Sequence, residues 1–294
     1  MAVEAERDTR VLGIAVMLLA MFLFTLNDAI GKWLVATYSV GQVLLIRSAA
    51  ALVVLLPFMR LREWRALTAL ERPRLQALRV FLASAEVFCF YAAVRYLPLA
   101  DVMTFWLAAP IYVAAASPFL LGERVSRLRW ACIAVGFMGV LLALAPSGAV
   151  SPGASIIAII GTMLFAGLIV TGRSLRGTPD RLLVFWQLIG ALAVGAVTAP
   201  FGWATPGAGD LALLAGLGVV AMGAHMGVSR ALKLADASVV APLQYTMLIW
   251  AILFGWLFFG DLPGPMMLAG AALILCAGLV MALFDRPARR VAGV

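Results

Sequence analysis

Three ionisable side chains lie inside long hydrophobic stretches of the sequence: Asp28, Arg47 and Glu86. A charge within a membrane costs at least ~2.5–3.5 kcal/mol, so each of these groups needs a partner or a water-filled space. We expect Arg47 and Glu86 to pair, because they lie at comparable depths below the same end of neighbouring stretches. Asp28 either pairs with Lys32, one helical turn further on, or serves as a proton site or a site for a substrate amine.

Aromatic and amide side chains gather beside two prolines. Pro110 and Pro242 each fall inside a hydrophobic stretch, where a proline removes a backbone hydrogen bond and frees a carbonyl group. A membrane helix also tolerates such a proline with no functional role. The neighbouring candidates for substrate contact are Phe90, Tyr91, Phe105, Trp106, Tyr112, Gln244 and Tyr245. These residue types predict a cavity for a neutral or zwitterionic molecule whose apolar part stacks on aromatic rings.

His225 is the only histidine of the chain, and it stands 135 residues after Phe90. Within a membrane helix it is a candidate for relaying protons, although a hydrogen-bonded packing histidine is the more ordinary interpretation. With one histidine, no H-E-x-x-H motif and no cysteine pair, we expect no metal site, and no G-x-x-x-x-G-K-[ST] loop is present to bind a nucleotide. No catalytic residue and no cofactor are expected.

The composition places these residues in a membrane protein. Hydrophobic residues make up 64% of the 294 positions and charged residues 12%, against ~45–50% and ~25% in ordinary soluble domains. Stretches of about 20 apolar residues are long enough to cross a membrane as helices. We expect ten of them, at about 11–34, 41–60, 77–96, 101–121, 128–146, 154–172, 182–202, 210–230, 237–259 and 266–284. The predicted fold class is therefore an all-α integral membrane protein.

The distribution of charge indicates the topology. Of the 22 Lys and Arg residues, 19 fall on the side of the predicted membrane that holds the N-terminus, and only Lys32 and Arg95 lie on the other. The positive-inside rule therefore predicts cytoplasmic N- and C-termini in a bacterial-type inner membrane. The net charge of +8 then reflects contact with lipid headgroups, and no nucleic-acid partner is expected.

An internal repeat divides the chain. The stretch RYLPLADVMTFW from Arg95 and the stretch RALKLADASVVA from Arg230 share five of twelve positions at a spacing of 135. Five predicted helices separate the copies, and an odd number of crossings reverses direction, so the halves must be inverted relative to each other. We predict two inverted five-helix repeats, 1–150 and 151–294. In each copy the aspartate, Asp101 or Asp236, is expected to cap a helix.

Each predicted half ends its fourth helix in a Gly-acid pair, LLGER at Gly122 and FFGDL at Gly260, where the glycine is expected to stop the helix. With ten helices in two inverted halves, the sequence resembles the EamA-type branch of the drug/metabolite transporter superfamily. Within that branch it is most similar to bacterial exporters of aromatic amino acids. The resemblance implies export of such amino acids and similar metabolites. The second half departs from the family pattern, with Asp261 in place of the usual Glu and Pro242 early in its helix.

Three functions remain open from the sequence. The first is a secondary transporter that exports aromatic or hydrophobic amino acids by alternating access, and the second is an antiporter of drugs or cationic metabolites with Asp28 or Glu86 as counter-ion. The third is a membrane-embedded lipid-modifying enzyme or a protein that transports nothing. Either facilitated diffusion or proton coupling is compatible with the sequence, as is a monomer.

Overall fold

The computed structural model describes residues 2–284 apart from 60–62, 65–66, 68–71, 121–125, 144–150, 176–177 and 235–240. Its described elements are all helical. They are α1 (Ala2–Thr37), α2 (Val40–Leu55), η1 (Leu56–Phe58), α4 (Pro73–Val94), α5 (Leu99–Leu107), α6 (Ala109–Leu120), α7 (Arg127–Ala143), α8 (Pro152–Ser174), α9 (Asp180–Thr198), η2 (Ala199–Gly202), α10 (Ala208–Leu234), η3 (Ala241–Tyr245), α12 (Thr246–Phe259) and α13 (Pro265–Phe284).

These helices match the ten expected membrane spans. Six described helices are long and apolar enough to cross a membrane, and four shorter apolar segments fall at Leu99–Val113, Trp130–Leu142, Leu243–Phe259 and Pro265–Val280. Two spans are composite. The fourth is split into α5 and α6, and the ninth begins as the 3-10 helix η3 before it continues as α12. The all-α membrane architecture is confirmed.

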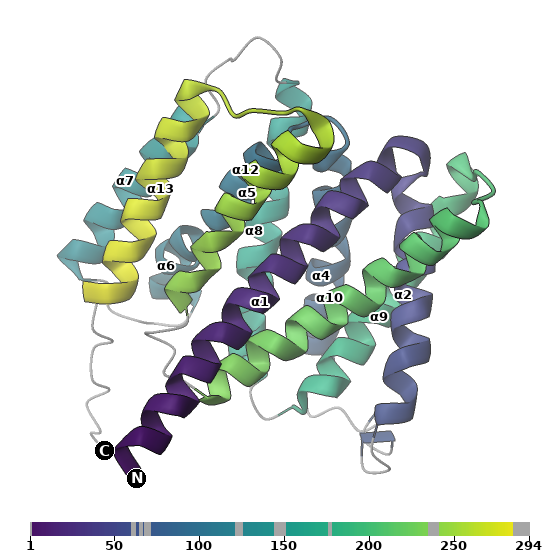
Figure 1. The fold of residues 1–294 in the computed structure, drawn as a ribbon, viewed down its shortest axis with the longest axis horizontal. Helices are drawn as coiled ribbons and strands as arrows, with labels where there is room; N and C mark the ends of the chain where they lie inside the picture. The colour runs from purple at the N-terminus through teal and green to yellow at the C-terminus, as the bar shows by residue number, and fades with distance from the viewer. Residues whose placement is uncertain are drawn as a thin grey trace.

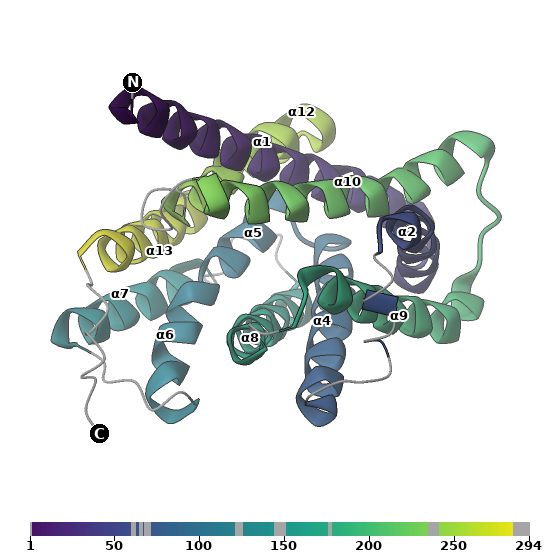
Figure 2. The same cartoon turned by 90° about the horizontal axis from the view of Figure 1, so that it is seen from below.

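The packing of the helices follows the inverted repeat. The most extensive contacts join α1 to α10, α4 to α8, α7 to α13 and α2 to α9. A shift of five spans relates each helix to its counterpart in the other half. This shift converts the α1–α10 pair into the α8–α4 pair, and it maps the α7–α13 and α2–α9 pairs onto themselves. A two-fold axis in the membrane plane requires this pattern. Figures 1 and 2 show α1 lying along α10, and α7 beside α13 at the other end of the molecule. Each half of the chain therefore packs mainly against the other half.

The two faces of the molecule are held by different contacts. We call the face where α1 begins and α13 ends the terminal face, and the opposite one the distal face (Figure 1). At the distal face the fully buried Gln42 donates from Nε2 to the Ala204 carbonyl (2.6 Å) and accepts from the Ala204 backbone N–H (3.1 Å). Tyr38 donates to Asp210 Oδ2 over 2.6 Å.

The corresponding contacts at the terminal face are longer. Arg72 Nη1 donates to the Ser174 carbonyl over 3.3 Å, and Arg181 Nη1 lies 3.6 Å from Glu63 Oε2. Buried hydrogen bonds are stronger than exposed, loosely aligned ones, because water competes for the latter. Among these contacts of the described residues, those at the distal face are therefore the shorter and more buried ones.

The helix ends correct one expectation and confirm another. Pro98 occupies the N-cap position of α5, and Asp101 lies inside the first turn, where its buried Oδ1 has no hydrogen-bond partner among the described residues. The predicted aspartate cap is thus wrong for Asp101, and Asp236 lies outside the described residues. Gly260 ends α12 with φ of 69°, a left-handed conformation that favours glycine. Gly122 is outside the described residues.

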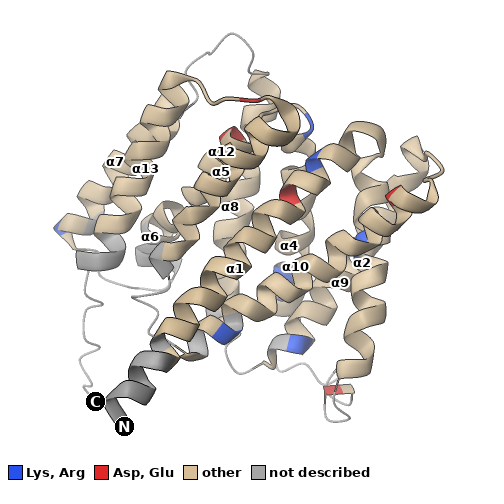
Figure 3. Ribbon diagram, viewed as in Figure 1, with Lys and Arg blue, Asp and Glu red and all other residues tan. Residues whose placement is uncertain are grey.

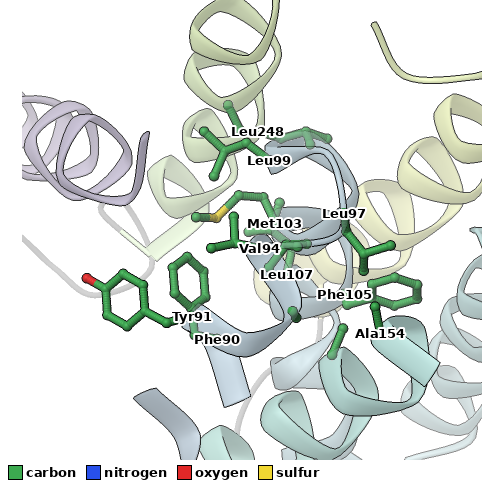
Figure 4. Packing of buried hydrophobic residues seen from close by; sticks show 14 of the residues in the cluster. Phe90, Tyr91, Val94, Leu97, Leu99, Met103, Phe105, Leu107, Ala154 and Leu248 are labelled. Carbon is green, nitrogen blue, oxygen red and sulfur yellow. The ribbon is translucent and has the colours of Figure 1, made fainter. Parts of the chain in front are cut away.

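A hydrophobic core joins the halves around α5. Phe90 and Val94 of α4, Leu99, Met103 and Phe105 of α5, Ala154 of α8 and Leu248 of α12 are buried in one cluster. In Figure 4 these side chains surround α5, with Phe105 and Ala154 close together. The broken helix is therefore held from both halves of the chain.

Candidate functional site

Ionisable groups from three different helices meet in the interior. We call this group the polar cluster: Asn27 and Asp28 of α1, Arg47 of α2, Glu86 and Tyr91 of α4, and Trp106 of α5. Arg47 Nη1 donates to the Tyr91 hydroxyl over 2.7 Å, and Trp106 Nε1 donates to Glu86 Oε1 over 2.8 Å. Asn27 Nδ2 lies 3.3 Å from Asp28 Oδ1. Charged positions away from the helix ends are few in Figure 3.

The partners in this cluster differ from those expected from spacing. Arg47 bonds to Tyr91, and Glu86 bonds to Trp106, so the direct Arg47–Glu86 pair is wrong. Lys32 lies 2.6 Å from Asp261 Oδ2, so the expected pairing of Lys32 with Asp28 is wrong as well. Arg47 and Lys32 therefore each bond to a residue distant in the chain. Arg47 bonds to Tyr91 instead of Glu86, and Lys32 bonds to Asp261 instead of Asp28 on its own helix.

Glycines bring the aromatic members into place. A β-carbon at Gly31 would lie 2.5 Å from Tyr91 Cε1, so the bare backbone of α1 lets the Tyr91 ring approach. A β-carbon at Gly161 of α8 would likewise collide with the indole ring of Trp106. Tyr91 is fully buried. Small residues at these crossings allow the helices to pack closely enough for the polar groups to meet.

The cluster contains two carboxyl groups and one guanidinium group. Asp28, Arg47 and Glu86 lie close enough to interact electrostatically, and Glu86 is only 8% exposed. If both carboxyl groups are ionised, the guanidinium does not neutralise them completely. A buried carboxylate without its own counter-charge is stabilised by a proton or by a cationic group. The cluster can therefore take up either a proton or a cationic group.

The aromatic candidates divide into two groups. Phe90, Tyr91 and Trp106 form one group, with the Phe90 ring 5.4 Å from Tyr91 and 5.2 Å from Trp106 in edge-on geometry. Phe105, although adjacent to Trp106, is 2% exposed and belongs to the core. The first group thus adjoins the polar cluster and forms an aromatic wall beside it.

The remaining candidates lie elsewhere. Tyr112 of α6 packs edge-on against Phe137 of α7, with ring centroids 5.2 Å apart. The Tyr245 hydroxyl lies against Gly278 of α13, and Tyr245 lines a separate apolar groove of about 370 Å³ between α12 and α13. Gln244 is exposed. The structure therefore does not bring these three residues together with Trp106 around one cavity.

Both prolines coincide with irregular backbone. Pro110 follows the junction of α5 and α6, where Ile111 N–H bonds to the Ala108 carbonyl over 2.9 Å. Pro242 lies within η3, immediately before α12. Irregular backbone within a membrane span is tolerated where other protein segments bury it or where it lines a cavity. The two interruptions give each half one span that can bend.

His225 lies on the part of α10 nearer the terminal face. One face of α10 carries Leu214, Gly218, Ala221 and His225, which follow one another at spacings of four, three and four residues. The first three of these residues are buried. His225 nevertheless is exposed. Its ring contacts Phe24 of α1 with centroids 4.7 Å apart, and it interacts electrostatically with Arg47 and with Arg79 of α4. The imidazole therefore lies against α1 and within electrostatic range of arginines on α2 and α4.

The position matched to His225 in the first half is closed. Phe90 of α4 is 7% exposed, whereas His225, 135 residues later, is exposed. Because the halves are inverted, Phe90 lies towards the distal face and His225 towards the terminal face. The same position of the repeat is therefore buried in the first half and exposed in the second.

An ion pair between the halves closes the distal side further. Lys32 of α1 reaches Asp261, which follows α12, and its Nζ also lies 4.5 Å above the Phe259 ring. Asp101 of α5 interacts electrostatically with both members of the pair. Sequence reasoning missed this contact because 229 residues separate the partners. The available signal was that Lys32 is one of only two cations predicted on that side.

Ten membrane spans in two inverted halves, around an internal polar cluster, are the architecture of a secondary membrane transporter. The chain belongs to the EamA-like transporter family, whose model matches residues 11–145 and 153–283. The protein is therefore a multi-pass membrane transporter of small molecules and not an enzyme, so the lipid-modifying enzyme considered from the sequence is wrong.

The chain is similar to transporters with different named substrates. It is 29% identical to a riboflavin transporter of Rhizobium johnstonii, over 95% of this chain and 93% of that protein. It is 25% identical to a pseudopaline exporter of Pseudomonas aeruginosa, over 92% and 95%, and 25% identical to an S-adenosylmethionine uptake transporter of Rickettsia prowazekii, over 91% of each. A solved crystal structure shares the fold, with a TM-score of 0.60 at 16% identity over 95% of this chain and 99% of the other.

Proposed function

We propose that the protein exports aromatic or hydrophobic amino acids and similar small metabolites across the inner membrane by alternating access. The observation that carries this proposal is the polar cluster beside the Phe90–Trp106 wall. A zwitterionic amino acid needs a carboxylate for its ammonium group, a guanidinium for its carboxylate and an apolar surface for its side chain. Glu86 or Asp28, Arg47 and the aromatic wall supply these three features.

The contrast between Phe90 and His225 supports alternating access. In inverted-repeat transporters the two halves exchange conformations, and the site opens first to one side and then to the other. An accessible His225 with a packed Phe90 corresponds to a state open at the terminal face. Exchange of the two conformations would bury His225, separate Lys32 from Asp261 and open the distal face. The prolines at Pro110 and Pro242 lie where spans four and nine would bend.

The relatives support a substrate of this general chemistry. Riboflavin, named for one relative, has a flat ring system, and S-adenosylmethionine, named for another, combines an amino-acid group with a nucleoside. Ring systems and amino-acid groups match an aromatic wall beside paired charges. Phenylalanine and tryptophan are small molecules that combine both features, and riboflavin is the natural comparison substrate.

The excess carboxylate favours a second candidate, antiport of a cationic metabolite or drug against protons. A proton on Glu86 or Asp28 could be exchanged for a cationic substrate, because either species satisfies the same charge. His225 is a candidate for passing the proton to the terminal face. This function predicts transport that depends on a pH gradient.

The charge distribution of the sequence supports an orientation with the terminal face in the cytoplasm. In that orientation the state described here is open to the cytoplasm, as an exporter is when it loads its substrate. The contacts that join the halves lie within one chain, so a monomer suffices for this mechanism.

Transport into proteoliposomes tests the proposal. Uptake of radiolabelled phenylalanine, tryptophan, threonine, riboflavin and a cationic dye is measured with and without an imposed pH gradient. Amino-acid uptake that exceeds that of riboflavin and needs no gradient supports the first proposal. Dye uptake that requires the gradient would replace it by the antiport mechanism. Riboflavin uptake without amino-acid uptake would contradict the assignment of amino acids.

A matched pair of variants links the result to the site. Arg47→Gln removes the guanidinium, while Arg95→Gln removes an exposed cation at the end of α4. The first variant is expected to raise the KM for amino acids at least tenfold, and the second to leave it within about twofold. Equal effects of the two variants would argue against direct binding by Arg47.

A further inference from the structure

A cavity of about 650 Å³ lies between α4 and α9, outside the polar cluster. Its lining includes Gln76, Val80 and Ser84 of α4 with Trp186, Gly190 and Val194 of α9. Phe81, which also lines it, is 63% exposed, so the cavity opens on the outer surface of the helix bundle. We call it the α4–α9 groove. On α4 it extends from Pro73 to Cys89, about 24 Å at 1.5 Å per residue.

The groove holds polar atoms that need a partner. Gln76 is 3% exposed, and neither its Nε2 nor its Oε1 has a hydrogen-bond partner among the described residues. The indole Nε1 of Trp186 is also buried without a partner there. Buried polar groups are nearly always hydrogen-bonded, because leaving one unpaired forfeits its hydration. Two unpaired donors in one apolar groove indicate a ligand that accepts hydrogen bonds.

The helix pair related to α4 and α9 by the inverted repeat also packs closely at one point. The pair related to α4 and α9 by the repeat is α10 and α2, and there the Arg47 carbonyl lies directly against Gly218, where no side chain could fit. Gly190 permits a similarly close approach to Val80 and Ser84 at one point. On either side of that point α4 and α9 leave the groove open.

Three arginines lie at the end of the groove nearest the terminal face, and one of them, Arg181, is 3.6 Å from Glu63 Oε2. Arg72 and Arg74 flank Pro73, which lines the groove, and both are exposed. Arg181 lies in the first turn of α9, five residues before Trp186. Arginines at the end of a membrane helix attract phosphate groups. Gln76 and Trp186 lie one to two turns deeper, at the level where the ester carbonyls of a lipid accept hydrogen bonds.

We propose that the α4–α9 groove binds one anionic phospholipid. Its phosphate lies among Arg72, Arg74 and Arg181, an ester carbonyl accepts hydrogen bonds from Gln76 and Trp186, and one acyl chain follows the apolar groove. The occupant differs from ordinary boundary lipid because its carbonyl satisfies buried donors. The bound lipid also fills the opening between α4 and α9, the two helices that Arg79 already links through its bond to the Leu183 carbonyl.

Photocrosslinking of the unmodified protein tests the position of the lipid. The full chain is reconstituted with a phosphatidylglycerol that carries a diazirine in one acyl chain, irradiated and digested, and the adducts are mapped. Adducts are expected mainly within 73–89 and 186–198. Adducts spread evenly over lipid-facing helices such as α13 would overturn the proposal.

Variants test the chemistry by native mass spectrometry with phosphatidylglycerol and phosphatidylcholine. Gln76→Leu, and Ala85→Phe inside the groove, are expected to reduce the retained phosphatidylglycerol at least fivefold, whereas Val53→Phe on the exposed surface of α2 is expected to leave it unchanged. Arg74→Gln with Arg181→Gln should lower the retention of phosphatidylglycerol about fivefold per arginine, with little change for phosphatidylcholine. Unchanged retention in the groove variants, or displacement of the lipid by phenylalanine or riboflavin, would overturn the proposal.

Discussion

Lys32 Nζ lies 2.6 Å from Asp261 Oδ2, and this ion pair joins the first half of the chain to the second at the distal face. Lys32 is one turn from the polar cluster, and Asp261 directly follows the glycine that ends α12. The pair therefore connects closure of the distal face to the helices that carry the site. A substrate that moves α1 or α12 must change this contact.

We expect His225 and Phe90 to differ in access to water. Both variants are made in a background in which the three native cysteines are replaced by alanine. His225→Cys should react with a membrane-impermeant maleimide at least ten times faster than Phe90→Cys, because position 225 is exposed and position 90 is buried. Labelling in vesicles of known sidedness measures both rates. Similar rates for the two positions would contradict a state open only at the terminal face.

Loss of the Lys32–Asp261 pair should favour opening of the distal face. A partly buried ion pair contributes about 1 kcal/mol, so Asp261→Asn should raise the labelling of Phe90→Cys about fivefold and slow that of His225→Cys. The reversed pair, Lys32→Asp with Asp261→Lys, should restore the original rates. If the single variant leaves both rates unchanged, the pair does not control access.

The Trp106–Glu86 hydrogen bond is expected to stabilise the fold. Trp106→Phe leaves a buried carboxylate without its donor and should lower the free energy of unfolding by about 1–3 kcal/mol. Glu86→Gln keeps an acceptor for the indole N–H and should cost less. Thermal unfolding of the purified protein compares the two variants, and a larger loss for Glu86→Gln would contradict the role of this bond.

Glu86→Gln also separates the two proposed functions. If the carboxylate carries a proton or binds a cation, the amide should abolish dye transport that depends on a pH gradient, because an amide takes up neither. Amino-acid uptake should remain measurable with a raised KM, since Asp28 can still meet the ammonium group. Proteoliposome uptake with and without the gradient measures both outcomes. Complete loss of amino-acid uptake with normal folding would assign the ammonium site to Glu86 alone.

The contact between Gly31 and Tyr91 should be sensitive to a single methyl group. Gly31→Ala would place a β-carbon 2.5 Å from the Tyr91 ring, so α1 and α4 must move apart or the Tyr91–Arg47 bond must lengthen. We expect a loss of about 1–3 kcal/mol in stability and a fall in transport. Gly223→Ala on α10, where no atom lies within 4 Å, should be neutral or slightly stabilising. Equal effects of the two substitutions would show that the Gly31 contact is unimportant.

The sequence alone determined the membrane class, the ten spans and the inverted order of the halves. Hydrophobicity needs no partner to be recognised, and a repeat separated by an odd number of crossings must be inverted. It also identified Asp28, Arg47, Glu86 and Trp106 as side chains with unusual surroundings. These conclusions depend on the cost of charge in a membrane and on chain direction, which local sequence contains.

Only the tertiary structure decided which of these groups meet. Lys32 bonds to Asp261 instead of Asp28, and Arg47 bonds to Tyr91 instead of Glu86, because helix rotation and glycine crossings such as Gly31 set the direction of each side chain. Tyr112 and Tyr245 match the wall in composition yet pack elsewhere. The difference between a buried Phe90 and an exposed His225 has the same origin, because related positions of a repeat can pack against different neighbours.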